Sequence, residues 1–262
     1  MSRAVDSAIQ TDVAPGPGGD IVRCVEATPL ETKPFDHLYM EGVFPPGYYR
    51  ELLARLPDLR RYRELRNRDA MQPDGRSARR KLYLYPEVIA LLPAEQRAFW
   101  LELSRVLRSR ALQEVFKRKF GAALERRFGR SIDRLWFYPV PMLLRDLGGY
   151  RIGIHGDSVS KAITVQFYLP PDESQAHLGT VFHEGRQGEA AERTKRLAFR
   201  PATGYAFPVM RHESYHSVPR MSAADGERNS LMLTYYTQEG PHGRIFERAK
   251  RFWLFLAYGL RR

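Results

Sequence analysis

The chain has 262 residues, of which 42 are Lys or Arg and 30 are Asp or Glu, so its formal net charge is +12. This length suffices for one large domain with a substantial core. The positive charge favours an anionic partner, whether a small anion, a phosphorylated glycan, nucleic acid or a membrane surface. The single cysteine, Cys24, excludes an intramolecular disulfide and a thiolate metal cluster. We therefore expect a protein of the reducing cytoplasm.

The first half of the chain predicts a lead-in followed by helices. Residues 1–33 are rich in Gly, Pro, Ala and Asp without periodicity, which predicts a flexible segment and shows no export signal. Residues 34–130 predict a helical supporting region. Within it, a helix begins at Pro45 and Pro46, and two or three further helices fit residues 93–129. The charged stretch 66–81 between them predicts a loop that orders over a ligand.

Residues 131–242 change to the pattern of strands. Seven short segments rich in β-branched and aromatic residues are separated by Gly, Pro and Asp, with no helical segment between them. They are residues 134–147, 150–157, 162–170, 177–184, 203–210, 214–221 and 228–236. The sequence therefore predicts an α+β protein with a mainly β core, built as a sandwich or a jelly roll.

Residues 243–262 predict a final basic amphipathic helix. Its apolar stripe consists of Ile245, Ala249, Phe252, Leu256 and Leu260. Two interpretations stay open: the helix packs on the β core, or it rests on an anionic membrane with Trp253 and Phe255 exposed. The apolar run at residues 252–260 is too short to cross a bilayer.

The chemistry-bearing residues begin with His155 and Asp157. Residues i and i+2 of a strand point to the same side, so the imidazole and the carboxylate converge. His216, in a later predicted strand, supplies a second imidazole. Two imidazoles and one carboxylate on one face of a metal are the ligands of non-haem Fe(II) oxygenases. His212, four residues before His216, is a rival for the third position.

The remaining histidines have simpler interpretations. We expect His183 to be structural or to face the substrate, and we expect His37, His177 and His242 to lie on the surface.

Arg228 opens the last predicted strand, twelve residues after His216. The apolar alternation of this strand carries its side chain inward, where a guanidinium needs an anionic partner such as one end of a dicarboxylate. Ser230 points the same way and can donate a hydrogen bond to the same carboxylate. The alternative, that Arg228 is half of a buried salt bridge, stays open.

The order His-x-Asp, His and Arg-x-Ser in a run of strands resembles the Fe(II)/2-oxoglutarate-dependent oxygenases, in particular their prolyl-hydroxylase-like branch. The resemblance covers residues 135–236. It implies a double-stranded β-helix, the cupin-like jelly roll. It also implies Fe(II) on His155, Asp157 and His216, with dioxygen and 2-oxoglutarate as co-substrates, the latter bound by Arg228 and Ser230. Members of this family often add a tyrosine, for which Tyr138 and Tyr168 are the candidates.

The resemblance further implies that an organic substrate is hydroxylated while succinate and carbon dioxide leave. The expected substrate is a small metabolite, an amino-acid-like compound or an anionic sugar, the last on a membrane glycolipid that the C-terminal helix would contact. A rival of another class is a non-catalytic basic jelly roll that binds nucleic acid or an anionic polymer. The sequence lacks the aromatic and basic stacking motifs of that class, so no nucleic acid is expected.

Overall fold

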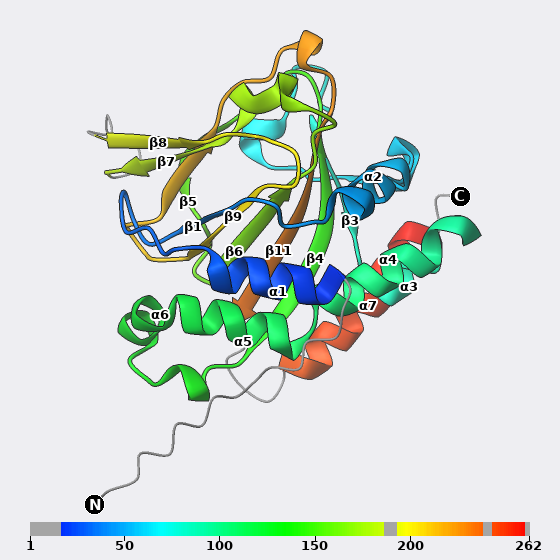
Figure 1. Cartoon of the computed structure of the whole chain (residues 1–262). Helices are drawn as coiled ribbons and strands as arrows, with labels where there is room; N and C mark the ends of the chain where they lie inside the picture. The colour runs from blue at the N-terminus through cyan, green and yellow to red at the C-terminus, as the bar shows by residue number, and fades with distance from the viewer. Residues whose placement is uncertain (1–16, 186–192, 238–242, 260–262) are drawn as a thin grey trace, which may run out of the picture.

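The computed structural model describes residues 17–185, 193–237 and 243–259, and it confirms a mixture of helices and antiparallel sheets. Figure 1 shows the helices gathered on one side of a large sheet, with the strands of a smaller sheet on the other side. The large sheet has seven strands in the order β1-β9-β6-β11-β4-β3-β2, and the small sheet has the order β5-β10-β7-β8.

The strands are short, and the two longest, β4 and β11, lie side by side in the middle of the large sheet. Their bounds are β1 Leu38–Met40, β2 Arg63–Glu64, β3 Arg79–Tyr83, β4 Phe137–Asp146, β5 Ile152–Gly156, β6 Lys161–Tyr168, β7 Thr180–Glu184, β8 Arg193–Leu197, β9 Gly204–Pro208, β10 Tyr215–Val218 and β11 Arg228–Thr237. From β4 to β11 the chain passes repeatedly between the two sheets: β4, β6, β9 and β11 lie in the large one, and β5, β7, β8 and β10 in the small one.

The helices are α1 Pro17–Ala27, α2 Pro46–Ala54, α3 Pro86–Ile89, α4 Ala94–Leu107, α5 Arg110–Lys119, α6 Gly121–Phe128 and α7 Gly243–Gly259. Local sequence accounts for several of their ends. Proline at the first position begins α2, and the Ser109 hydroxyl accepts a hydrogen bond from the Leu112 amide at the start of α5. Gly129 ends α6 in the left-handed conformation, with φ of 62°.

The buried apolar residues form two clusters. The larger lies between the large sheet and the helices, and includes Trp100, Phe116 and Leu233. The smaller lies between the two sheets, where Tyr168 and Phe207 of the large sheet meet Phe182 of the small one. Both faces of the large sheet are therefore buried.

The face of the large sheet that looks toward the small sheet is unusually polar for a buried surface. Along β11, Leu231 and Leu233 point to the helices, whereas Arg228, Ser230 and Thr234 point the other way and are fully buried. A polar interior is costly unless its groups are paired or bind a ligand. This face is therefore the natural place to look for a site.

Three expectations about the chain are corrected. The flexible lead-in is wrong for Pro17–Ala27, which forms α1 and buries Ile21 and Val25, while residues 1–16 lie outside the described residues. The helical supporting region also contributes β1, β2 and β3, which extend the large sheet at its two edges. The strand β8 is absent from the seven predicted strand segments, because its sequence RTKRL has few of the apolar residues that mark a strand.

The final helix is present as predicted, but it packs through a different face. Leu254 and Tyr258 contact the core, whereas Phe252 and Trp253 are 60% and 68% exposed. Arg251 pairs with Glu87 of α3, which fixes the helix to the body of the protein. Within the described part of the chain, no helix combines the length and the apolar character needed to span a membrane.

A glycine tests the close packing of the two strands β7 and β8. A Cβ on residue 179 would lie 1.9 Å from the carbonyl oxygen of Leu197, so the backbone would have to move. We expect Gly179→Ala to lower the free energy of unfolding by at least about 2 kcal/mol, measured by urea denaturation. Gly47→Ala in α2 is the control, because nothing lies within 4 Å of the added atom, and it should be neutral or slightly stabilising. Equal stability of both variants would contradict this packing.

Candidate metal centre

The structure brings His155, Asp157 and His216 together at the edge between the two sheets. His155 on β5 lies directly opposite His216 on β10 in the antiparallel register, and their ring centroids are 4.3 Å apart. Asp157 follows β5 immediately and points to the same side. One ligand atom from each of the three residues lies within 4.8 Å of the others. Among the described residues, this is the one such group of three.

Both imidazoles are oriented by the backbone. The Nδ1 of His155 lies 2.9 Å from the carbonyl oxygen of Gly153, and the Nδ1 of His216 lies 3.3 Å from that of Ser214. A carbonyl accepts, so each Nδ1 carries the proton and each Nε2 lone pair is left for a metal. Burial lowers the pKa of His216 to about 4, against the opposing charge of Asp157, so this ring is neutral at physiological pH.

The third ligand, Asp157, is held by two side chains of β6. Lys161 Nζ donates to Asp157 Oδ1 at 2.5 Å, and Thr164 Oγ1 donates to Oδ2 at 2.6 Å. Burial alone would raise the pKa of Asp157, but the charge of Lys161 and these hydrogen bonds hold it well below its usual range. The carboxylate is therefore ionised, as a metal ligand must be.

This donor set fits Fe(II). Two imidazoles and one ionised carboxylate, presented from one side, leave the other coordination positions open. The contacts of Asp157 with Lys161 and Thr164 leave further lone pairs on its oxygens. The residues present thus meet the chemical requirements of a mononuclear non-haem iron centre.

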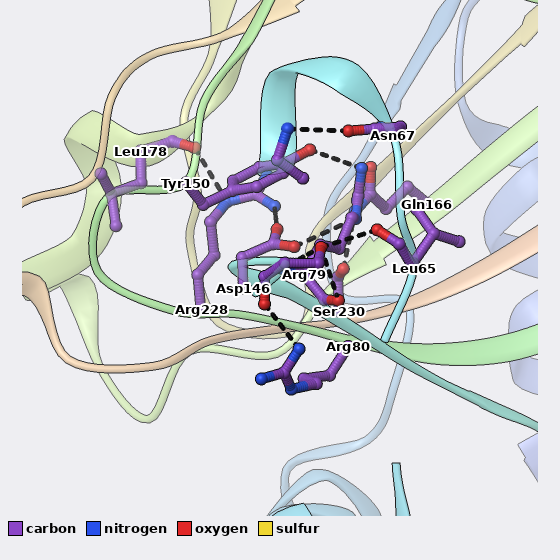
Figure 2. Close-up of polar contacts among 12 residues, drawn as sticks. Leu65, Asn67, Arg79, Arg80, Asp146, Tyr150, Gln166, Leu178, Arg228 and Ser230 are labelled. Atoms are coloured by element: carbon purple, nitrogen blue, oxygen red, sulfur yellow. Dashed lines mark hydrogen bonds and ion pairs between the residues drawn. The ribbon is translucent and has the colours of Figure 1, made fainter. Parts of the chain in front are cut away.

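A cluster of buried charges occupies the other end of the same interior (Figure 2). Arg79 on β3, Asp146 on β4 and Arg228 on β11 are register partners on neighbouring strands, so their side chains lie side by side. Arg228 Nη1 donates to Asp146 Oδ2 at 2.9 Å, and Arg79 Nε lies 3.0 Å from Asp146 Oδ1. Arg228 is therefore half of a buried salt bridge, the alternative that the sequence left open.

The salt bridge does not neutralise the cluster. Two guanidinium groups share one carboxylate, and Arg228 is fully buried. Its Nε donates to the carbonyl of Leu178 at 3.0 Å, but its Nη2 has no hydrogen-bond partner among the described residues. A buried, unsatisfied donor on an excess positive charge is expensive, and an anionic ligand would remove that cost.

Polar residues connect the two ends of the interior. Gln166, between Thr164 and Tyr168 on the inward face of β6, donates to Ser230 Oγ at 2.6 Å and accepts from the Tyr205 hydroxyl at 2.6 Å. Burial alone would lower the pKa of the Arg79 guanidinium. Nearby acidic groups, Asp157 among them, have the larger effect and raise it above its usual value. The metal ligands and the arginine cluster therefore act on each other electrostatically.

The two candidate tyrosines lie in different places. Tyr168 is fully buried, with its ring centroid 5.5 Å from the Arg228 guanidinium, and burial raises its pKa to about 12 despite the charge of Arg228. The ring of Tyr138 stacks on that of Tyr236, with the ring centroids 5.4 Å apart. On β4, Tyr138 lies six residues away from the residue that pairs with Ser230. Tyr168 is thus beside the cluster, and Tyr138 is not.

The other histidines take no part in this group. His212 is exposed in a turn with φ of 66°, and His183 pairs with Ser217 at 2.7 Å. His177 is exposed as predicted. The expectation for His37 was wrong: it is fully buried against Phe182, and its Nδ1 lies 2.7 Å from the carbonyl oxygen of Phe35. His242 lies outside the described residues.

Several residues of the site were missed from the sequence. Asp146 and Arg79 come from strands that are 82 and 149 positions away from Arg228, and no local pattern links them. Lys161 and Thr164 lie close to Asp157 in sequence, so a hairpin between the two strands could have suggested them. Asp69, in the expected loop, accepts a hydrogen bond from the Gly153 amide at 3.0 Å and thereby ties that segment to the strand of His155.

No protein-family model and no curated protein sequence matches this chain. Solved structures do. A prolyl-4-hydroxylase of Pseudomonas putida aligns with a TM-score of 0.52 at 13% identity, covering 86% of this chain and all of that one. A prolyl hydroxylase of Trichoplax adhaerens, solved with a peptide fragment of hypoxia inducible factor, aligns with a TM-score of 0.50 at 11% identity, covering 84% and 89% of the two chains.

The chain has the fold of the prolyl hydroxylases. At these identities the likeness concerns the fold alone, and it confirms at that level the resemblance that the His-x-Asp, His and Arg-x-Ser order indicated. The prolyl-hydroxylase fold also explains why the helices α1, α4 and α5 gather on one side: they cover the outer face of the large sheet and leave its polar inner face to the site.

Lys161 and a bound metal ion would compete for the carboxylate of Asp157. An ammonium group beside a metal ligand repels a dication, so its removal should strengthen binding. We expect Lys161→Met to bind Co(II), an air-stable substitute for Fe(II), about tenfold more tightly by isothermal titration. Lys195→Met is the matched control, since Lys195 pairs with Glu31 outside the site, and it should bind as the unaltered protein does. Weaker binding by Lys161→Met would show that the orientation of Asp157 by Lys161 outweighs the repulsion between Lys161 and the metal.

Proposed function

We propose that the protein is an Fe(II)- and 2-oxoglutarate-dependent dioxygenase that hydroxylates an organic substrate and releases succinate and carbon dioxide. The observation that carries this proposal is the pairing of two features in one interior. A set of two imidazoles and one carboxylate lies at one end, and a buried cluster with one guanidinium in excess lies at the other. We also infer that the alternation of β4–β11 between the two sheets is the winding of a double-stranded β-helix.

In this proposal His155, Asp157 and His216 hold the iron, and Arg228 pairs with the far carboxylate of 2-oxoglutarate. The Nη2 of Arg228 is the donor available for that carboxylate, since its Nη1 and Nε are engaged by Asp146 and Leu178. Ser230 and Tyr168 lie on the same face and are register partners, so both are placed to contact the same ligand. Bound iron and 2-oxoglutarate would supply the oxidising chemistry, in which one oxygen atom of dioxygen enters succinate and the other enters the substrate.

The protein's own groups prepare this chemistry. The backbone carbonyls of Gly153 and Ser214 fix the tautomers of the two histidines, and Lys161 with Thr164 keeps Asp157 ionised and oriented. The aromatic residues between the sheets, such as Phe182 and Phe207, exclude water from the interior. The set of two imidazoles and one carboxylate favours this function over the alternative of a non-catalytic protein that binds nucleic acid or an anionic polymer.

The decisive substitution is Arg228→Met. If Arg228 holds the far carboxylate, Fe(II)- and oxygen-dependent conversion of 2-oxoglutarate to succinate should show a KM for 2-oxoglutarate raised about 10- to 100-fold. Arg145→Met is the matched control: Arg145 is also buried and lies on β4, but it points to the opposite face and bonds to Asn229. Its KM should stay within a factor of about two.

Two results would contradict the proposal. Absence of any iron-dependent succinate formation by the unaltered protein would remove the assigned activity. An unchanged KM in Arg228→Met would show that the wrong cation had been assigned. Because loss of Arg228 disturbs a buried ion cluster, Arg228→Lys provides a second variant that keeps the charge, and it should give an intermediate KM.

A further inference from the structure

A groove of about 1,600 Å³ lies apart from the metal centre, between the segment from Leu59 to Glu64, the strand β3 and the helix α7. Seven cationic side chains line it, among them Arg60, Arg66, Arg80 and Lys81. Of the described residues in its wall, Glu64 is the one that carries a negative charge. The groove is thus a concentration of the chain's excess positive charge.

Ion pairs with two carboxylates compensate part of this charge, and in one of them Asp58 lies 3.5 Å from Arg60. Glu64 is shared by Arg66 and Arg80, each 3.1 Å away, so one carboxylate serves two guanidinium groups. Arg61 and Arg97 donate to the backbone carbonyls of Leu91 and Leu92, which fixes their positions without neutralising them. An anionic ligand would therefore meet preoriented cations.

The other part of the groove wall is apolar. Leu91 after α3 and Leu254 of α7 are partly exposed in this wall, while Leu82 of β3, Val88 of α3 and Leu92, which also line it, are buried. A soluble polyanion such as nucleic acid would gain nothing from this aliphatic surface. A molecule with both an anionic head and an apolar body would use both walls.

The helix α7 extends this surface outward. Its Leu254, Ala257 and Tyr258 line the groove, and the Tyr258 hydroxyl donates to the carbonyl of Lys81 at 3.0 Å. On the same helix, Phe252 and Trp253 are 60% and 68% exposed. Exposed aromatic side chains next to a basic surface are typical of proteins that bind at the interface of an anionic membrane.

We propose that this groove binds the head group of an anionic lipid at a membrane surface, and that Phe252 and Trp253 enter the interfacial layer. The proposal rests on the charge and the apolar wall of the groove, and it does not depend on the iron centre. If the protein is an oxygenase, the groove brings it to the membrane where an amphiphilic substrate is found.

The test is co-sedimentation of the full chain with vesicles of phosphatidylcholine alone and of phosphatidylcholine with 30% phosphatidylglycerol. We expect binding to the anionic vesicles only, weakening as salt rises. The double variant Arg60→Glu and Arg66→Glu should bind at least about tenfold more weakly. The matched control is Arg118→Glu with Arg126→Glu, which changes the charge equally at exposed, ion-paired arginines of α5 and α6. The control should retain most of the binding.

The aromatic contribution has its own pair of variants. Trp253→Ser should weaken vesicle binding about fivefold or more, whereas Trp136→Ser, at an exposed tryptophan before β4, should not. Metal binding by all these variants should equal that of the unaltered protein, which separates this result from failure of the oxygenase assignment.

Three outcomes would overturn the proposal. The first is failure of the vesicle test. Either the double variant Arg60→Glu and Arg66→Glu sediments with the vesicles as the unaltered protein does, or the unaltered protein does not bind anionic vesicles at low salt. The second is binding of inorganic pyrophosphate through the groove without vesicle binding, which would make the ligand a soluble anion. The third is a dimer in solution that Trp253→Ser converts to a monomer, which would make the aromatic face of α7 a contact between two copies.

Discussion

The interior of this protein is organised around the carboxylate of Asp146, which is shared by the guanidinium groups of Arg79 and Arg228 on the two neighbouring strands. Charges are normally kept out of a core, and a buried ion cluster with one cation in excess is justified by what it can bind. The cluster holds β3, β4 and β11 in a fixed register and gives the space between the sheets its positive end. A dicarboxylate is the ligand that would complete it.

The candidate metal ligands lie at the opposite end of the same interior. Antiparallel pairing of β5 and β10 puts His155 opposite His216, and the two-residue period of a strand adds Asp157. Because these ligands and the arginine cluster share one interior, a small molecule can touch both at once. The hydrogen-bonded residues Gln166, Ser230 and Tyr205 line the path between them.

The sequence was informative where structure repeats over short distances. The period of two placed His155 and Asp157 on one side, and short apolar segments located seven of the strands. It was uninformative where partners are distant: nothing near Arg228 reveals Asp146 or Arg79. Strand β8 escaped detection because its partner β7, and not its own apolar content, makes it a strand. Helix α1 was missed because a Gly- and Pro-rich start masks the stripe of Ile21, Val22 and Val25.

The proposed function requires iron and 2-oxoglutarate to bind together in this interior. Joint binding can be measured by an anaerobic titration with Fe(II) and 2-oxoglutarate, followed by the weak visible charge-transfer absorption that a chelated 2-oxo acid gives with Fe(II). We predict that the band appears with the unaltered protein and is absent with His216→Ala. A folded, metal-loaded protein that never shows the band would contradict the claim.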